Sequence, residues 1–351
     1  MNKTRFGHQC HRSPNSPITH LSRIIFTTAW ALTGALAALS PKPAMAQNAY
    51  VQSNLVSDIP GLALVTDTNL INPWGIAASA TSPFWLSDNV TGLSTVYTGA
   101  GVKESLVVTI PVPSGESGPS SPTGIIANTV AGFQATGTAT AHFIFSTQNG
   151  TISAWNTGSA AVLKVDLSSS YADFTGLAAG VSGGSNFIYA PDFYNGQIDV
   201  FDTNYALVTL AGSFHDPAIP AGYSPFGIQN INGELFVTYA LQSGGYSYVS
   251  GPGNGYVDIF DTSGNLLQSF AAQGPLNAPW GVALAPIGFG YYAGNILIGN
   301  FGDGRINVFN PATGAWAGPL MNNTNGGAIE VAGLWGLAFG NGKSGGDAHT
   351  L

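Results

Sequence analysis

The sequence predicts an all-β protein, a six-bladed β-propeller with four strands in each blade. A short phrase with a central glycine recurs six times, at intervals of 49, 52, 51, 54 and 55 residues. This spacing is close to the length of a four-stranded propeller blade. Apolar and alternating strand patterns follow each copy except the last, and no stretch beyond residue 46 has sustained helical periodicity.

The recurring phrase, called here the glycine phrase, predicts the innermost strand of each blade. Its copies occupy residues 73–76, 122–125, 174–177, 225–228, 279–282 and 334–337. In four copies an aromatic residue precedes the glycine: Trp74, Phe226, Trp280 and Trp335. These rings could form a ligand-facing set that stacks on a sugar or a peptide. Because the position repeats with the period of the fold, packing between blades is the favoured interpretation.

Two further strand patterns complete the repeat. An apolar, aromatic strand follows the glycine at 84–89, 142–150, 187–196, 234–240 and 295–304. An alternating strand that ends in an aromatic residue comes next, at 94–99, 151–156, 197–202, 256–261 and 305–310. A weaker fourth strand closes each unit, and six such units require about 310 residues. The 305 residues from 47 to 351 therefore predict a single domain.

These motifs resemble the NHL-repeat and gluconolactonase-like six-bladed propellers. The clearest copy is 224–270, which carries the phrase "SPFGI" and the strand "YVDIF". More narrowly, residues 54–77 and the late "GLWGLAFGNG" look like an uncharacterised family of secreted bacterial propellers. That resemblance implies the fold but no particular reaction.

The last repeat is short, because only 15 residues follow Gly336. We expect an incomplete sixth blade that contains 334–339 and a stub at 349–351. The N-terminal strands 49–56 and 62–66 would close it, leaving an aggregation-prone edge. A gene fragment would explain the same shortness.

The first 46 residues read as a signal peptide. A basic segment precedes an uncharged run of 16 residues at 24–39, and Ala44-Met45-Ala46 has the form of a cleavage site. The run is shorter than the ~20 residues of a membrane span, although an uncleaved anchor is the alternative. We expect cleavage near Ala46 and a secreted or periplasmic protein with no membrane attachment.

Composition limits the partners of the cleaved chain. Five of the nine basic residues lie in 1–46 and all 17 acidic residues follow, so four bases and 17 acids give a net charge of −13. This acidity argues against nucleic acid as a partner. Cys10, the only cysteine, is in the leader, which excludes disulfides and thiol chemistry from the rest. We expect a monomer.

Polar residues after the second strands suggest a metal site: Asp88, Asn89, Asp192 and Asn300. If the blades bring them together, carboxylate and amide oxygens suit Ca²⁺. The gluconolactonase-like resemblance implies such a metal set of Glu, Asn and Asp, although no glutamate stands at the first-blade position here. The alternative is that Asp-Gly and Asn-Gly pairs form hairpin turns.

A second candidate is the pair His215 and Asp216, which could perform acid–base chemistry as in the streptogramin-lyase type of propeller. A structural role in a turn is the alternative. The sequence contains no nucleophile elbow, zinc-protease motif or phosphate-binding loop.

Three functions remain open. The favoured hypothesis is an exported, non-enzymatic binding module with a protein or glycan ligand. The first alternative is a metal-dependent hydrolase or lyase, lactonase-like, with a central Ca²⁺. The second is a structural protein of a matrix or surface, consistent with 7% charged residues and 47 glycines.

Overall fold

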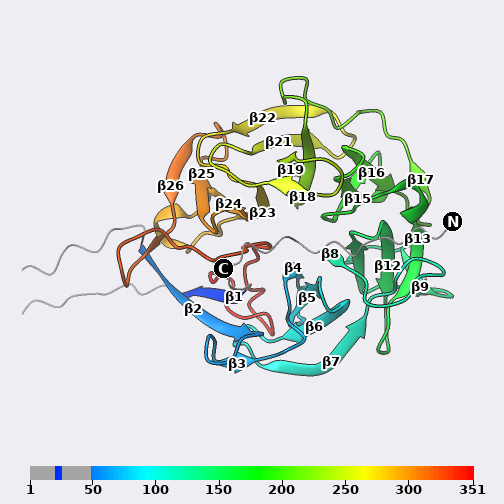
Figure 1. The fold of residues 1–351 in the computed structure, drawn as a ribbon, viewed down its shortest axis with the longest axis horizontal. Helices are drawn as coiled ribbons and strands as arrows, with labels where there is room; N and C mark the ends of the chain where they lie inside the picture. The colour runs from blue at the N-terminus through cyan, green and yellow to red at the C-terminus, as the bar shows by residue number, and fades with distance from the viewer. Residues whose placement is uncertain (1–19, 26–48) are drawn as a thin grey trace, which may run out of the picture.

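The computed structural model describes residues 20–25 and 49–351, which form a β-propeller whose sheets surround a central axis (Figure 1). Regular structure in these residues consists of strands and two short 3₁₀ turns, η1 (Ser168–Ser170) and η2 (Gly290–Tyr292). None of the helical segments described is long and apolar enough to cross a bilayer. The predicted all-β propeller is confirmed.

The described residues form five four-stranded blades rather than the six expected. Blade 1 contains β4 (Pro73–Ala77), β5 (Phe84–Asp88), β6 (Leu93–Tyr97) and β7 (Lys103–Thr109). Blade 2 contains β8 (Pro122–Ala127), β11 (Phe143–Thr147), β12 (Thr151–Trp155) and β13 (Val162–Asp166). Blade 3 contains β14 (Ala178–Ser182), β15 (Ser185–Asp192), β16 (Gln197–Phe201) and β17 (Leu207–Val208).

The other two blades follow the same antiparallel order. Blade 4 contains β18 (Tyr223–Ile231), β19 (Glu234–Gln242), β21 (Tyr256–Asp261) and β22 (Leu266–Ala272), with β20 (Tyr248–Val249) paired to β19. Blade 5 contains β23 (Pro279–Leu284), β24 (Ile296–Asn300), β25 (Ile306–Phe309) and β26 (Trp316–Pro319). A small hairpin, β9 (Gln134–Thr136) and β10 (Ala139–Thr140), extends from blade 2.

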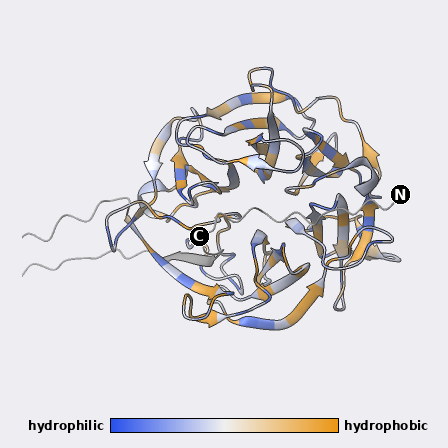
Figure 2. Ribbon diagram, viewed as in Figure 1, coloured by the Kyte–Doolittle hydropathy of each residue, from blue (hydrophilic) through white to orange (hydrophobic). Residues whose placement is uncertain are grey.

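Tight turns join the second and third strands in blades 1, 2, 3 and 5. Each turn contains a glycine with positive φ, where other residues are strained: Gly92, Gly150, Gly196 and Gly304. Hydrophobic residues run along the strands of the blades (Figure 2), and they pack between neighbouring blades as separate cores. The apolar faces that are buried between neighbouring blades stabilise the ring.

The glycine phrases form a closed ring around the axis. A Cβ atom on Gly75, Gly124, Gly227 or Gly281 would lie less than 3.0 Å from backbone of the next phrase. The sixth glycine, Gly336, donates its N–H to the carbonyl oxygen of Trp74 at 3.0 Å. Glycine is required at the crowded positions because a side chain would separate adjacent inner strands.

The part of the ring between blade 5 and blade 1, called here the sixth sector, differs from the prediction. Residues 334–339 and 349–351 form no strand. The sector instead contains β2 (Ala49–Ser57), which pairs with β3 (Val65–Thr66), β27 (Met321–Asn322) and β1 (His20–Ile25). The expected N-terminal strands are therefore present. The inner strand is absent because residues 334–339 have no second strand to pair with.

Hydrogen bonds attach the C-terminal segment of the sixth sector to blade 1. Asn341 Nδ2 donates to the carbonyl oxygens of Ser79 and Ser82, both at 2.8 Å. Gly99 also donates its N–H to Ser344 O at 2.9 Å. The expected cleavage site at Ala44–Ala46 lies outside the described residues, although β1 belongs to the predicted leader.

Candidate functional site

Aromatic side chains meet at the centre of the ring. Trp74 from blade 1 stacks on Trp335 of the sixth sector, with ring centroids 3.5 Å apart. Trp74 also contacts Phe226 of blade 4 and Trp280 of blade 5 edge-on, at 6.3 and 6.1 Å. Blades that are not neighbours touch only across the axis. We call this group the axial cluster; its members are Trp74, Phe193, Phe226, Tyr248, Trp280, Phe301 and Trp335.

The axial cluster fits because two glycine phrases carry threonine where the others carry an aromatic ring. Thr123 and Thr175 occupy these positions in the second and third phrases. The Trp280 indole N–H donates to Thr175 O at 2.8 Å. Four large rings and two small side chains therefore fill a centre that six rings would overcrowd.

The four predicted aromatics are buried together at the centre of the ring. Trp74, Phe226, Trp280 and Trp335 are each at most 9% exposed. They pack against one another at the axis, both between neighbours in the ring, such as Trp280 and Trp335, and across it, as for Trp74 and Phe226. In this position they close the centre of the channel to solvent.

A chain of amide side chains surrounds one side of the cluster. Trp335 Nε1 donates to Asn72 Oδ1 at 3.1 Å, and Asn72 Nδ2 donates to Asn89 Oδ1 at 3.2 Å. Asn89 Nδ2 continues to Gln148 Oε1 at 3.1 Å. These bonds link the sixth sector to blades 1 and 2. Asn89, one of the predicted metal ligands, is thus occupied by protein partners.

Asp192 and Asn300 each stabilise the loop that enters their own blade. Asp192 Oδ1 accepts the Asp173 N–H at 3.0 Å, and its Oδ2 accepts Asn195 Nδ2 at 2.7 Å. Asn300 Oδ1 accepts the Asn277 N–H at 3.1 Å. Both residues lie opposite the start of a glycine phrase, so this bonding pattern repeats with the blades.

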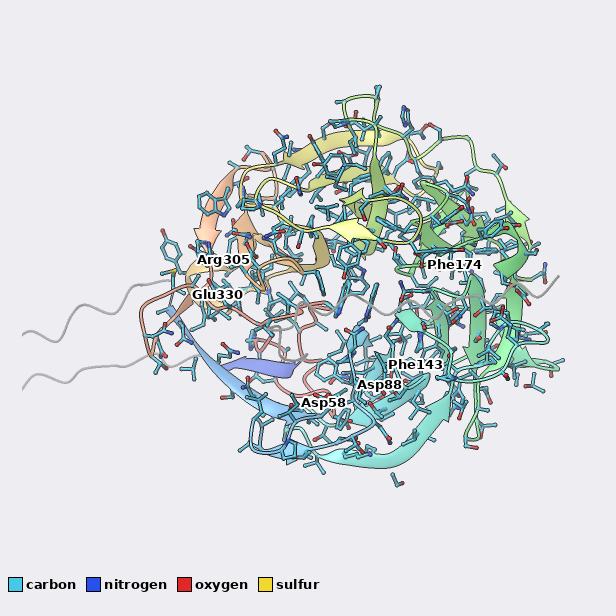
Figure 3. The ribbon with its side chains drawn as sticks, in the orientation of Figure 1. Asp58, Asp88, Phe143, Phe174, Arg305 and Glu330 are labelled. Carbon is cyan, nitrogen blue, oxygen red and sulfur yellow. The ribbon has the colours of Figure 1, made fainter. Side chains whose placement is uncertain are left out.

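Asp88 lies within blade 1 (Figure 3), fully buried, and neither carboxylate oxygen has a hydrogen-bond partner. Burial raises its pKa well above the usual range, which favours the neutral acid. Nearby, Asp67 accepts the Lys103 ammonium at 2.7 Å. Although burial alone would raise the pKa of Asp67, this bond and the Tyr97 hydroxyl lower it. Of the two aspartates, Asp67 is therefore the ionised one.

The predicted metal ligands do not converge. Asp88 of blade 1 faces Thr95 of the same blade and Asp67, which follows β3, whereas Asp192 faces Asp173 and Asn300 bonds within blade 5. Among residues 20–25 and 49–351, no three His, Cys, Asp or Glu side chains are arranged to hold a metal ion. Asp173 resembles Asp88: it is fully buried, and burial, followed by the charge of Asp192, raises its pKa.

His215 and Asp216 point to different surroundings. His215 is exposed, whereas Asp216 is 4% exposed and accepts the Ala218 N–H at 2.7 Å and the Ser269 hydroxyl. Asp216 faces Asp258 of β21 instead of the histidine. Burial, followed by the charge of Asp216, raises the pKa of Asp258 to about 7. Asp258 is therefore a buried acid that lies beside Asp216.

Three tyrosines form a strip at the surface beside the axial cluster; we call it the tyrosine ladder. Tyr194 stacks on Tyr171 with centroids 5.7 Å apart and lies 4.6 Å from Tyr246. Tyr171 and Tyr194 are 43% and 37% exposed. Phe193, next to Tyr194 in the chain, belongs to the axial cluster, which fixes the base of the ladder.

The segments that carry the ladder share a composition. They are 168–171, 193–196 and 241–250, which contain serine, glycine, asparagine and tyrosine and no charged residue. Gln242 holds two of them together by donating from Nε2 to Phe193 O. The sequence contained one signal for this surface. Blade 4 has a long connection at 243–255 where the other blades have a tight turn.

Comparisons with known proteins identify relatives. No family model matches the chain. An uncharacterised protein of Acanthamoeba polyphaga mimivirus is 36% identical over 310 residues, which cover 84% of this chain and 75% of the viral protein. A second uncharacterised mimivirus protein is 35% identical over 300 residues, covering 81% and 77%. The chain belongs to the family of these mimivirus proteins.

The relatives found are mimivirus proteins, so the secreted bacterial family that residues 54–77 suggested is not confirmed. Among solved structures, virginiamycin B lyase from Staphylococcus aureus is similar, with a TM-score of 0.50 and 16% identity. The alignment covers 84% of this chain and 82% of the lyase. At this identity the likeness supports the propeller fold alone.

Proposed function

We propose that this protein is a non-enzymatic glycan-binding module, exported by its leader, and that the tyrosine ladder is its contact surface. The observation that carries the proposal is the ladder itself: three adjacent tyrosine rings at the surface, anchored on a rigid aromatic core. Tyrosine supplies a large, stiff contact area with a polar hydroxyl, at a small cost in conformational entropy.

The surroundings of the ladder favour a neutral ligand rich in hydroxyl groups. The serine, asparagine and glycine residues of 168–171, 193–196 and 241–250 offer hydroxyls, amides and accessible backbone. Binding loops with this composition form adaptable hydrogen bonds around aromatic anchors. No charged side chain in these segments would attract an ionic ligand. Sugar rings meet both requirements, because they have an apolar face for stacking and hydroxyls at their edges.

The closed centre of the ring is consistent with binding at the surface rather than on the axis. A metal-dependent reaction in the channel needs convergent ligands and room for a substrate. The axial cluster occupies that room, and the candidate ligands Asp192 and Asn300 bond within their own blades. The lactonase-like hypothesis therefore receives no support from the site.

A glycan array tests the proposal. The purified protein is expected to bind a defined set of neutral glycans. Tyr194→Ala should weaken binding to those glycans about five- to ten-fold, corresponding to roughly 1–1.4 kcal/mol of lost stacking. Trp316→Ala is the matched control, since Trp316 is an exposed aromatic residue (52%) on β26 of blade 5. An array without hits, or equal losses in both variants, would refute the proposal.

A further inference from the structure

In the sixth sector, the apolar packing between neighbouring parts of the ring is interrupted. At the other blade contacts, apolar side chains from both blades form one core. For example, Trp85 of blade 1 stacks on Phe143 of blade 2 with centroids 4.2 Å apart. In the sixth sector two cores lie apart: one around Phe289 and Leu297 of blade 5, and one around Leu55 and Phe84.

A cavity of about 90 Å³ lies between these two cores. Its apolar wall is assembled from blade 1, blade 5, β2 and the sixth glycine phrase: Ile76, Phe84, Ile306, Leu55, Leu334 and Leu337. Polar side chains, among them Gln52, Thr98 and Thr350, also line it. The wall and the polar groups are therefore supplied by segments far apart in the sequence.

The cavity follows from the missing inner sheet of the sixth sector. Side chains such as Ile76 and Ile306 lie on blade faces that would pack against a sixth blade. Residues 334–339 reach the axis but make no strand, and β2 pairs with β1, β3 and β27 instead. The space that regular middle strands would fill is thereby left with apolar walls.

We propose that this cavity binds a small, uncharged molecule with an alkyl or ring body and a hydroxyl group. An apolar cavity of ~150 Å³ in another protein binds benzene, so 90 Å³ accommodates an apolar body of about four carbons. Thr98 and Thr350 supply hydroxyls for the polar group, and the Gln52 amide, which donates to Asn54 Oδ1 at 3.3 Å, also lines the cavity. The Asp347 carboxylate, which also lines the cavity, disfavours a carboxylate ligand. This site is separate from the tyrosine ladder.

A series of linear alcohols tests the site in the full chain. Dissociation constants for ethanol through 1-octanol are measured by ligand-observed NMR titration. Each added methylene should tighten binding about four-fold while it is buried, and the gain should stop after roughly four or five carbons. Butanoate should bind more weakly than 1-butanol. Binding without a chain-length dependence, or no saturable binding, would overturn the proposal.

A filling substitution assigns the binding to this cavity. Ala338 lines the cavity and is only partly buried, so Ala338→Phe places a ring in the space. This variant should reduce 1-butanol affinity at least ten-fold with an unchanged or higher melting temperature. Leu207→Phe on β17, an exposed apolar site in blade 3, is the matched control. If Ala338→Phe does not fold, Leu337→Phe serves the same purpose. Wild-type affinity in the folded filling variant would refute the assignment.

Discussion

The ring of glycines makes a quantitative prediction about stability. Gly227 and Gly176 occupy the same place in two glycine phrases, and neither has a positive φ. A Cβ atom on Gly227 would lie less than 3.0 Å from the Trp280 carbonyl oxygen, whereas the nearest atom to one on Gly176 is Ile228 N at 3.4 Å. The substitutions Gly227→Ala and Gly176→Ala therefore differ in steric fit and not in backbone preference.

The magnitudes follow from that difference. Overpacking costs typically ~1–3 kcal/mol, while replacing glycine with alanine restricts the unfolded chain and returns ~0.4–1 kcal/mol. Gly227→Ala should thus lower the free energy of unfolding by about 1–2 kcal/mol. Gly176→Ala makes only ordinary contacts, so its free energy of unfolding should change by no more than ~0.5–1 kcal/mol, in the stabilising direction.

Urea denaturation of both variants, followed by tryptophan fluorescence, checks this prediction. The axial tryptophans report on the ring directly, because three of the indoles lie within the axial cluster. Equal destabilisation of the two variants, or none in Gly227→Ala, would show that the glycines are not required for close contact between inner strands.

Three further predictions follow from the buried groups. Trp74→Ala removes the ring stacked on Trp335 and should cost ~3–5 kcal/mol of unfolding free energy, whereas Trp316→Ala, which alters an exposed ring, should cost less than ~1 kcal/mol. The pKa of Asp258 is raised to about 7, so the folded state binds more protons than the unfolded state between about pH 4 and pH 7. The contribution of this group to stability is then complete below about pH 4 and is lost as the pH rises through 7; Asp258→Asn should flatten this part of the stability curve by up to a few kcal/mol, and an unchanged pH profile would contradict the assignment. Because Asp192 and Asn300 are engaged by protein partners and no three acidic or histidine side chains of the described residues are arranged to hold a metal ion, a chelator should leave the melting temperature unchanged, and a decrease on adding EDTA would restore the metal hypothesis.

The sequence predicted the repeating parts of the fold well. The strands at 84–88 and 256–261, for instance, appear where the apolar, aromatic pattern and the alternating pattern, respectively, placed them. Strand patterning recurs in each blade, and glycine-containing turns join the second and third strands of blades 1, 2, 3 and 5; these signals are local, so the five blades could be read directly. The structure of the sixth sector could not be predicted in this way, because its residues 334–339 carry the local signal of a strand but lack a partner strand.

The surface beside the channel was harder to predict. Tyr171, Tyr194 and Tyr246 belong to three loops, and their stacking depends on the relative position of blades 2, 3 and 4. Neither spacing nor composition fixes that geometry. Likewise, Trp74 and Trp335 are separated by most of the chain, and only closure of the ring brings them into contact. Contacts across the axis are consequences of the tertiary fold.

Hydrogen–deuterium exchange of the protein with a glycan identified on the array tests the binding surface most directly. The account predicts that the glycan slows exchange in 193–196 and 241–250, the segments that carry Tyr194 and Tyr246. Exchange in the outer strands of blade 5 and in the sixth sector should stay unchanged. Protection confined to the sixth sector, or none in the ladder segments, would contradict the assignment of the tyrosine ladder as the ligand-binding surface.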